Sequence, residues 1–394
     1  MTQRLHLADP GIHARRRQAF LAQLGRPVLV FGMGSALGGG SKSQGALRYL
    51  TGWDGHESAS LLIMSPLGAR LITASPFMAP LAAEVLPELA PVYLPPAGWP
   101  GLIREAVPLG AVDMIGLDEV PMGIARVLQP VIRQNNVTCA VLDRMRAVKE
   151  PAALDLHRAG AAICDAMFAH LPAELRVGES VSAIQRRLEG FGLSQGADYC
   201  RTWLTIGPAA DRPRYWSEET GGTVAMGDQV LMGIALTVDG HWAHGIRMGS
   251  VGPMRPDHAR LFEIVSDCLQ AGLDLARPGV ALTDLADAME GAFVAGTGGL
   301  DLRGAQRFRF GHGLGMSYED PVLTDAFVQS FGVPHIAARP EGAGGVLAPG
   351  MVLELHPNLF LPGIGGAALG EMVIIGDSGA ERPISYPLMP FCLG

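Results

Sequence analysis

The sequence predicts an α/β amino-terminal domain followed by an α+β carboxy-terminal domain. A chain of 394 residues is longer than one compact core usually holds, so two domains are expected. In the first third, short apolar runs alternate with helical stretches, which is typical of a sheet covered by helices. Beyond it, amphipathic helices accompany strands separated by Gly-rich turns, which indicates mostly antiparallel sheet. We therefore predict domains at residues 1–146 and 147–394.

Each element follows from a local pattern of apolar residues. Short apolar runs predict buried strands at residues 26–33, 58–65, 69–75 and 113–119. Apolar side chains at three- and four-residue spacing predict helices at residues 14–24, 78–90, 150–175, 180–190 and 256–276. The long helix at 150–175 is expected to open the second domain. Pro256 suits the first turn of the last helix.

Composition restricts the partners. The formal net charge is −8, and no basic segment indicates a nucleic acid or an anionic membrane, so a small molecule is the expected ligand. The five cysteines never have a CxxC spacing, which argues against a disulfide framework and a thiolate zinc site. No run resembles a signal peptide or reaches the length of a membrane span. A cytoplasmic location is therefore expected.

The stretch VDGHWAHGIRMGS, residues 238–250, predicts a β-hairpin that carries two histidines. Its Asp-Gly pair is a strong signal for a two-residue turn with positive φ. Folding the chain about this turn opposes Ala235 with His244, and directly opposed side chains share a face of the sheet. Gly233 lies on the same face, so two small residues leave space beside the imidazole of His244. His241 is expected on the other face, in a structural role.

A similar phrase occurs twice in the second domain. MGDQVLMGIA around Gly227 and APGMVLELHP around Gly350 each run from a glycine into an apolar strand. Gly233 and His356 stand six residues after these glycines. The repetition indicates a duplicated half-domain. If the two halves face each other, His244 and His356 converge.

Four motifs carry a family resemblance when they are taken in order. They are YLTGWDG at residues 49–55, the hairpin ending in GIRM, GHGLGMSYEDP at 311–321, and LAPGMVLELHPNLFLPG at 347–363. Together they resemble the M24 peptidase or "pita-bread" family, which includes aminopeptidase P, prolidase, creatinase and ectoine hydrolase. The resemblance covers nearly the whole chain. It implies a creatinase-type amino-terminal domain, a pita-bread carboxy-terminal domain and a homodimer.

The resemblance also implies a dinuclear metal site, yet most ligand positions of the metallopeptidases differ in this chain. Gly233 and His244 stand where the hairpin of those enzymes carries two aspartates, and His356 replaces a glutamate. His312 matches the ligand histidine of the GHG phrase. Two divalent cations need several carboxylate oxygens to offset and bridge them. The sequence therefore argues against a dinuclear Mn, Co or Zn centre.

Two carboxylates near these positions are further candidates. The last glutamate of the family site aligns with Gly370 or, after a one-residue slip, with Glu371, and both alternatives remain open. Glu354 stands two residues before His356 and is expected on the same strand face. There it would orient an imidazole or bind a cationic group of the substrate, unless it is a solvated or salt-bridged carboxylate.

Two interpretations of the histidines remain open. Without a metal, His244 or His312 acts as general base for water and a second imidazole protonates the leaving nitrogen, because histidine titrates near neutral pH. With a metal, the nitrogen-rich set suits one late divalent ion. The ligands of that ion would be His244, His312, His356 and Glu371 or Glu354. The expected cofactor is therefore either none or one divalent metal ion.

Substrate-binding candidates come from the same alignment. Arg214 takes the place of a histidine that several members of the family use for proton transfer, and its guanidinium suits a substrate carboxylate. Arg247 is a second possible clamp, at a position that is usually structural. Trp242 and Tyr318 are expected to wall the site, although aromatic residues at such places often only pack.

We therefore expect an enzyme that hydrolyses a C–N bond of a small polar, carboxylate-bearing metabolite without the usual dinuclear centre. One alternative is a mononuclear His-rich metalloenzyme with hydrolytic, lyase or oxidative chemistry. Another is a non-catalytic protein that binds small molecules on the same scaffold.

Overall fold

The computed structural model describes residues 11–34, 42–56, 58–108, 110–208, 222–319, 323, 326–327 and 345–393. These residues divide into two compact units. The first unit contains the described residues up to Arg146 together with residues 315–319, and the second contains the rest. The predicted limits of 1–146 and 147–394 stay predictions, and they did not anticipate that residues 315–319 would group with the first unit.

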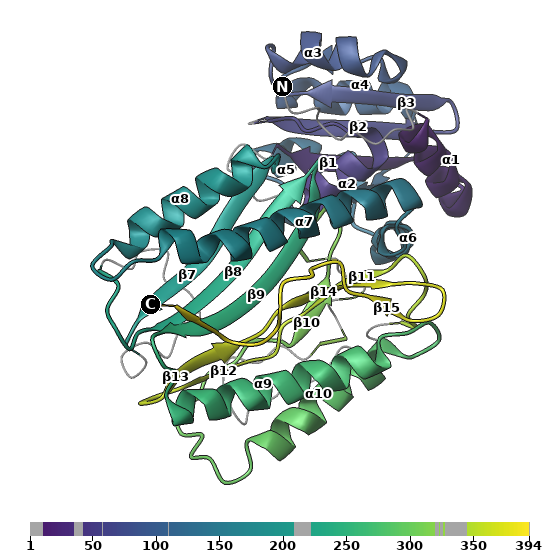
Figure 1. Ribbon diagram of the computed structural model, residues 1–394. Helices are drawn as coiled ribbons and strands as arrows, with labels where there is room; N and C mark the ends of the chain where they lie inside the picture. Colours follow the sequence, from purple (N-terminus) through teal and green to yellow (C-terminus); the bar gives the residue numbers. More distant parts are fainter. Residues whose placement is uncertain are drawn as a thin grey trace. The chain divides into compact units, whose positions relative to one another are not determined.

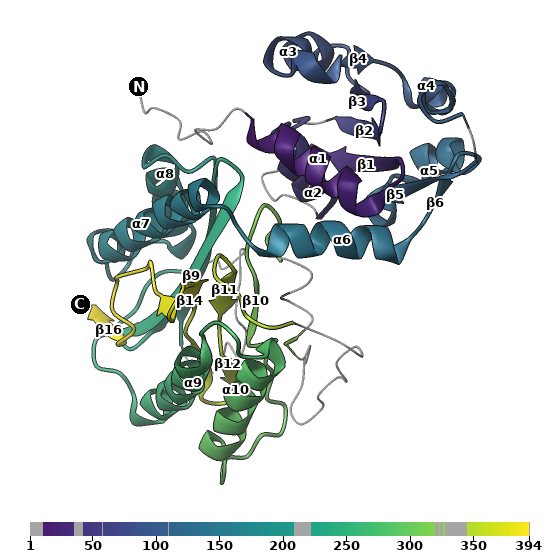
Figure 2. The same ribbon diagram turned by 90° about the vertical axis from the view of Figure 1, so that its right-hand side faces the viewer.

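The first unit is a six-stranded mixed sheet in the order β4-β3-β2-β1-β5-β6. Its strands are β1 Val28–Met33, β2 Ala59–Ser65, β3 Gly68–Thr73, β4 Val92–Tyr93, β5 Val112–Ile115 and β6 Ile132–Arg133. Its helices are α1 Ile12–Leu24, α2 Lys42–Thr51, α3 Met78–Val85, α4 Trp99–Ala106, α5 Met122–Leu128 and α6 Asn136–Ala147. Both faces of the sheet are covered, by α1, α2 and α6 on one side and by α4 and α5 on the other (Figure 2).

The alternation along β1 explains why its sequence is a continuous apolar run. Val28 and Val30 pack in a cluster with Phe20, whereas Leu29 and Phe31 pack in a second cluster with the α4 and α5 residues. Successive residues of a strand point to opposite faces, so a strand covered on both sides must be apolar at every position.

One predicted helix is divided. The stretch predicted as helical at residues 78–90 ends its α-helix at Val85, and a short 3-10 helix, Pro87–Leu89, follows. Leu86 between them has a non-helical φ of −136°. Proline disfavours the α conformation of the residue before it, which accounts for the break.

The second unit contains two four-stranded sheets, ordered β16-β9-β8-β7 and β10-β11-β14-β15, and the two-stranded sheet β12-β13. The strands of the first are β7 Tyr199–Gly207, β8 Gln229–Val238, β9 His241–Val251 and β16 Phe391–Leu393. The other strands are β10 Gly311–Gly313, β11 Val352–Leu355, β12 Asn358–Leu361, β13 Gly365–Ala368, β14 Glu371–Ile375 and β15 Ala380–Glu381. The expected α/β and α+β units are therefore both present.

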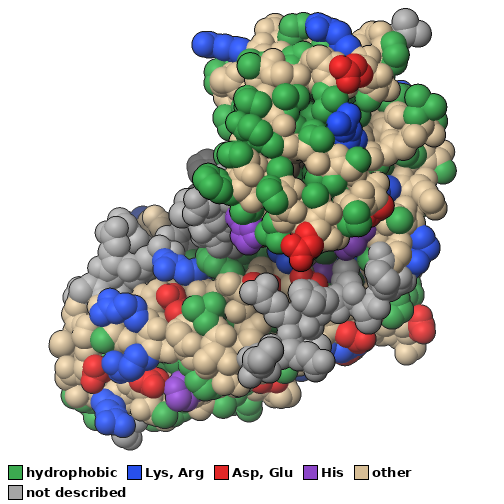
Figure 3. All heavy atoms as spheres, turned by 90° about the horizontal axis from the view of Figure 1, so that it is seen from above, with side chains coloured by type: hydrophobic (Ala, Val, Ile, Leu, Met, Phe, Trp, Pro, Cys, Tyr) green, Lys and Arg blue, Asp and Glu red, His purple; other side chains and the backbone are tan. Residues whose placement is uncertain are grey.

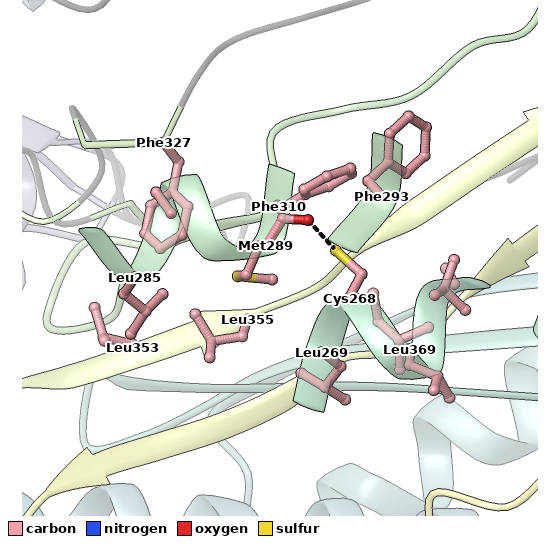
Figure 4. Packing of buried hydrophobic residues seen from close by; sticks show 14 of the residues in the cluster. Cys268, Leu269, Leu285, Met289, Phe293, Phe310, Phe327, Leu353, Leu355 and Leu369 are labelled. Carbon is pink, nitrogen blue, oxygen red and sulfur yellow. Dashed lines mark hydrogen bonds between the residues drawn. The ribbon is translucent and has the colours of Figure 1, made fainter. Parts of the chain in front are cut away.

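Two pairs of helices pack against these sheets. α7, Pro151–Glu174, packs on β9, and α8, Val181–Ser194, packs on β7 (Figure 1). α9, Pro256–Leu275, and α10, Leu282–Gly296, lie side by side and enclose an apolar core with β11. Figure 4 shows Cys268 and Leu269 of α9 beside Met289 of α10 and Leu355 of β11 in this core. These helices cover one surface of each sheet, so a functional site is expected on the opposite surface.

The predicted hairpin is confirmed, including its register. Ala235 lies opposite His244, and Gly233 lies opposite Ile246. The turn residues Asp239 and Gly240 have φ values of 43° and 73°. These positive values at both positions are those of the two-residue turn that Asp-Gly favours.

The repeated phrase adopts a similar turn in both places. Gly227, just before β8, has a φ of 90°, and Gly350, just before β11, has a φ of 87°. Glycine adopts this region without the steric cost that a side chain brings. The equivalence of the two turns supports the interpretation that β8 and β11 begin two related half-domains.

The sequence predicts neither a membrane nor a nucleic acid as a partner, and the structure bears on both expectations. Among the described residues, no helix has the length and apolar character needed to cross a bilayer. On the face seen in Figure 3, Lys and Arg side chains occur among acidic and apolar ones and do not gather in one patch.

Candidate active site

Three imidazole rings from different segments lie together in the second unit. His244 is on β9, His312 is on β10, and His356 directly follows β11. The ring centroids are 5.8 Å apart for His244 and His312, 5.9 Å for His244 and His356, and 5.0 Å for His312 and His356. The structure thus brings together the three histidines that the family alignment places at metal-ligand positions.

Strand pairing explains the convergence. His312 on β10 lies directly opposite Glu354 on β11, so both side chains point to one face. Ile246 and Gly370 exchange two backbone hydrogen bonds of 3.1 and 3.0 Å, which join β9 to the residue before β14. Because His244 and Ile246 share a face of β9, the rings of the two sheets meet beside this joint.

Glu354 is a buried carboxyl group within the cluster. Its side chain is 0% exposed, and its Oε1 lies 3.7 Å from Nδ1 of His244, which is too long for a direct hydrogen bond. Neither oxygen has a hydrogen-bond partner among the residues that the structure describes. Burial and then the charge of Glu371 raise the pKa of Glu354 well above its usual range, although Arg247 opposes this shift. The carboxyl group therefore keeps its proton until a cation approaches it.

Burial also keeps imidazoles of the cluster neutral. It lowers the pKa of His244 well below the ordinary value, and the neighbouring His312 and His356 add to the effect. Burial, followed by the influence of His312, lowers the pKa of His356 in the same direction. His356 keeps partial exposure, whereas His244 and His312 are buried. A neutral imidazole has one ring nitrogen that can accept a proton.

The strand register separates the two alternatives for the last ligand position. Glu371 lies opposite Leu355, on the face that packs against α9 and α10, whereas Met372 lies opposite Glu354. Gly370 therefore falls on the face of Glu354 and the imidazoles. A carboxylate at position 371 therefore points away from the histidines. The role of Glu371 as a ligand or catalyst stays a prediction, and the strand register argues against it.

Glu371 is engaged by a buried arginine instead. Arg247 Nη2 donates a hydrogen bond of 2.9 Å to Oε2 of Glu371, and both side chains are 0% exposed. The guanidinium also donates to the carbonyl oxygens of Gly370, Tyr386 and Pro387. Arg247 thus joins β9 to the residue before β14 and to the carboxy-terminal segment. Its donors are used in these contacts, so the alternative of a substrate clamp at this residue is not supported.

An aromatic residue outside the predicted set contacts the cluster. Trp203 on β7 packs its ring edge-to-face with His244, with centroids 5.2 Å apart. Trp203 lies opposite Gly233 on β8, so the absence of a side chain at Gly233 leaves room beside it. The sequence signal was the alternation of Tyr199 and Trp203 along β7, which places both on the face of His244.

The predicted substrate-binding residues have different positions. Trp242 is buried, and its ring packs against Tyr199 with centroids 5.6 Å apart, which indicates packing within the sheet face. Tyr318 is half-buried in residues 315–319, which group with the first unit. Arg214 lies outside the described residues. The substrate-binding roles of all three stay predictions.

His241 has the structural surroundings that the hairpin predicts. It is buried, its Nδ1 lies 3.0 Å from the carbonyl oxygen of Asp239, and its ring meets His157 of α7 edge-to-face. Trp242 on β9 and Thr237, its partner on β8, lie on the other face of this sheet, together with His244.

The donor set determines which metal centre the site could hold. On the described strands, the face of the imidazoles carries one carboxylate, Glu354. Two divalent cations need several bridging oxygens, so these residues do not fit a dinuclear centre. Within the described part of the chain, no three His, Cys, Asp or Glu side chains are grouped closely enough to hold one ion. A single ion would require His244, His312, His356 and Glu354 to move toward a common point.

Comparison with known proteins identifies the family. The sequence model of metallopeptidase family M24 matches residues 155–377, which is more than half of the chain. The chain is 23% identical over 245 residues to the uncharacterized peptidase YqhT of Bacillus subtilis, covering 62% of this chain and 64% of that protein. It is 27% identical over 280 residues to the probable dipeptidase PepE of Mycobacterium tuberculosis, covering 70% of this chain and 67% of that protein.

Solved structures give the same architecture. An Xaa-Pro dipeptidase from Bacillus anthracis superposes with a TM-score of 0.76 at 17% identity, covering 98% of this chain and 100% of that chain. The predicted combination of an amino-terminal creatinase-type domain with a pita-bread domain is thereby confirmed. The family prediction is confirmed as well: this chain belongs to metallopeptidase family M24.

Proposed function

We propose that this protein is a hydrolase that cleaves a C–N bond in a small polar metabolite without a dinuclear metal centre. The observation that carries the proposal is the group of three imidazoles, 5.0 to 5.9 Å apart, with one buried carboxyl group 3.7 Å from His244 and opposite His312, on a face with no other carboxylate on its described strands. Membership of a peptidase family favours amide-type C–N bonds. YqhT and PepE, a peptidase and a probable dipeptidase by name, favour the same class of reaction.

The residues allow an acid–base route. A neutral His244 or His312 takes a proton from water, and the resulting hydroxide attacks the carbon of the scissile C–N bond. The imidazolium formed in this step then gives its proton to the leaving nitrogen as the C–N bond breaks. Glu354 lies 3.7 Å from Nδ1 of His244 and stabilises the positive charge that appears on that ring. Each proton taken from water is thus returned to the product amine.

The remaining parts of the proposal concern the substrate and its surroundings. Arg214 is proposed to bind a substrate carboxylate, and Tyr318 and Trp242 are proposed to contact the substrate.

We also propose a homodimer and a cytoplasmic location, in accordance with the family resemblance. Sedimentation velocity of the full chain measures the oligomeric state directly.

The test is hydrolysis of a panel of small amides by protein prepared with and without chelator. The panel contains Xaa-Pro dipeptides, N-acyl amino acids and small amidino acids, and the released amine is quantified. We expect turnover that survives chelation and that falls about 10²- to 10⁴-fold in His244→Gln, the usual range for loss of a general base. Turnover that requires two bound ions per chain contradicts the proposal.

A mononuclear metalloenzyme is the second candidate function. Its support is the nitrogen-rich donor set beside a carboxylate whose oxygens have no hydrogen-bond partner among the described residues. His244, His312, His356 and Glu354 would hold the ion, which would supply a Lewis acid to polarise the substrate. One tightly held ion per chain in elemental analysis, lost in both His244→Ala and His312→Ala, favours this candidate. Ligand-induced thermal stabilisation without turnover instead favours a binding protein.

A further inference from the structure

His356 lies in a break between two strands. β11 ends at Leu355 and β12 begins at Asn358, so His356 and Pro357 belong to neither strand. Proline has no N–H, which interrupts the ladder of backbone hydrogen bonds at this point. The ring of His356 nevertheless lies 5.0 Å from that of His312. Contacts other than a continuous ladder must therefore hold it there.

The side-chain amide of Asn358 supplies such contacts. Its Nδ2 donates a hydrogen bond of 2.8 Å to the carbonyl oxygen of His356, and its Oδ1 accepts one of 2.7 Å from the N–H of Phe308. Asn358 is 2% exposed, so water competes little for these bonds. The amide thus joins the segment that leads into β10 to the residue that carries the third imidazole.

The strand register is the same on both sides of this amide. Gln306 lies opposite Phe360 and exchanges two hydrogen bonds of 2.9 Å with it. Gly311 lies opposite Leu355. The two pairs are equally far apart on both segments, so no residue is inserted between them. The irregularity at His356 therefore lies in its hydrogen bonds and in the direction of its side chain, and not in the register.

The two residues that this register opposes send their side chains in different directions. The N–H of His356 donates a hydrogen bond of 2.8 Å to the carbonyl oxygen of Phe310. Directly opposed side chains share a face in a regular ladder. Here the ring of Phe310 packs on Phe293 in the core, whereas the ring of His356 lies beside His312. The amide of Asn358 explains this departure, because it occupies a carbonyl oxygen and an N–H that the backbone of a regular ladder would pair.

We propose that Asn358 is a positioning residue that holds the imidazole of His356 in the cluster for the reaction. The inference rests on the proposed function, because it assigns a role within the same site. Of the three imidazoles, His356 is the one with partial exposure, so a substrate that enters from solvent meets this ring first. The neutral ring offers the substrate one N–H donor and one acceptor nitrogen. These groups orient a substrate only if the ring is held in a fixed place.

A second side-chain amide in the same unit provides a matched control. Gln229 also bridges two backbone groups, because its Nε2 donates to the carbonyl oxygen of Ile364 and its Oε1 accepts from the N–H of Gly366, both at 3.3 Å. The carbonyl oxygen of Gly366 lies 2.8 Å from Nε2 of His258. The ring of His258 therefore reports on the bridge made by Gln229.

The ring signals of two histidines test the proposal without knowledge of the substrate. NMR of the full chain, labelled at the histidine ring nitrogens, records them, and His356→Gln and His258→Gln identify the two sets. We expect Asn358→Leu to shift the signals of His356 and to leave those of His258 in place. Gln229→Leu should do the reverse. Shifts of both rings in both variants overturn the proposal.

A more conservative variant decides the question if Asn358→Leu does not fold. Asn358→Gln keeps the amide on a stem that is one methylene longer, so the amide cannot reach both partners from its present place. We expect the signals of His356 to shift here as well, and circular dichroism verifies the fold. Unchanged His356 signals in a folded Asn358→Gln protein contradict the assignment of Asn358.

Kinetics on an amide that the panel identifies separate positioning from a purely structural role. Asn358→Leu should lower kcat about 10- to 100-fold and keep KM within about twofold, because a displaced ring affects the transition state more than binding. Gln229→Leu should keep both constants within about twofold. Equal losses of kcat in the two variants, or an unchanged kcat in Asn358→Leu, overturn the proposal. Absence of hydrolysis in the unmodified chain contradicts the proposed function instead, and the ring signals then decide whether Asn358 holds His356.

Discussion

Asp113 in the first unit and Glu354 in the second are both buried carboxyl groups, but their surroundings are opposite. Asp113 accepts hydrogen bonds from Thr138 at 2.7 Å and Asn135 at 3.2 Å and forms ion pairs with Arg26 and Arg133. Glu354 has no hydrogen-bond partner among the described residues.

The pKa values of the two groups move in opposite directions as a result. Burial by itself would raise the pKa of Asp113, yet hydrogen bonds from Arg133 and Thr138 and the charges of both arginines lower it. Burial raises the pKa of Glu354, with too little positive charge nearby to offset it. A carboxylate that is fully paired serves the fold. One that remains unpaired in an otherwise well-packed sheet face is better explained by a ligand.

The largest expected effect comes from removing the buried arginine that pairs with Glu371. Arg247→Met removes the closer of the two arginine partners of Glu371 and the donors to four backbone carbonyl groups, all inside the second unit. We expect a loss of about 3–5 kcal/mol in the free energy of unfolding, the usual cost of leaving a buried charge without its partner. Urea denaturation measures it. A loss below 1 kcal/mol would show that Arg382, the second donor to Glu371, is enough to keep this carboxylate paired.

A smaller loss is expected at Asp113. Asp113→Asn keeps the shape but removes the charge that Arg26 and Arg133 share, and we expect a loss of about 2–3 kcal/mol. The cost is lower than for Arg247 because the two arginine side chains are 38% and 54% exposed and can be hydrated. The pKa of Asp113 is lowered by folding, so its contribution is present at neutral pH and falls as pH drops below about 4. The variant should lack this part of the acid dependence.

Local sequence patterns were sufficient for the strands and helices that were predicted, apart from the break at Leu86, and for the hairpin. The Asp-Gly turn fixes the register of β8 and β9, and once the register is fixed, the period of two places His244 beside Ala235. The repeated phrase pointed to the other half-domain, which contributes His356. These features could be predicted because each depends on residues close together in the chain.

Other features depend on contacts between distant segments and could not be read from the sequence. A one-residue slip decides whether position 370 or 371 faces the histidines, and the alignment left both open. The partners of Arg247 include the carbonyl groups of Tyr386 and Pro387, about 140 positions along the chain. Trp203 reaches His244 because β7 pairs with β8; alternation along β7 shows which of its residues share a face, but it does not fix that pairing.

His157 is a third buried titratable group, and it has one hydrogen-bond partner, the Trp242 carbonyl. The dependence of stability on pH tests whether its burial outweighs that partner. Burial and the positive charge of Lys149 lower the pKa of His157 to about 3, although its hydrogen bond to the Trp242 carbonyl opposes this. A lowered histidine pKa means that the unfolded chain binds a proton first, so stability falls as pH drops below 6.5. We expect His157 to account for a loss of about 2 kcal/mol between pH 6.5 and pH 5.

His157→Gln should remove that slope while its amide keeps a donor for the Trp242 carbonyl. Urea denaturation of both proteins at several pH values from 6.5 to 5 gives the difference, in which the other groups cancel. Parallel curves for the two proteins would mean that His157 is not desolvated in the folded state.

The smallest change in the free energy of unfolding is expected for Glu354→Gln, the counterpart of Asp113→Asn. Glu354→Gln removes no hydrogen bond between described residues, and it replaces a group that burial disfavours as a charge with a neutral amide of the same shape. We expect the free energy of unfolding at pH 7 to change by less than about 1 kcal/mol or to increase, in contrast to Asp113→Asn. Functional carboxyl groups are held at a cost to stability, and removing them relieves that cost. A loss as large as that of Asp113→Asn would place Glu354 among the structural carboxylates, because only a carboxyl group that stabilises the folded chain costs that much to remove.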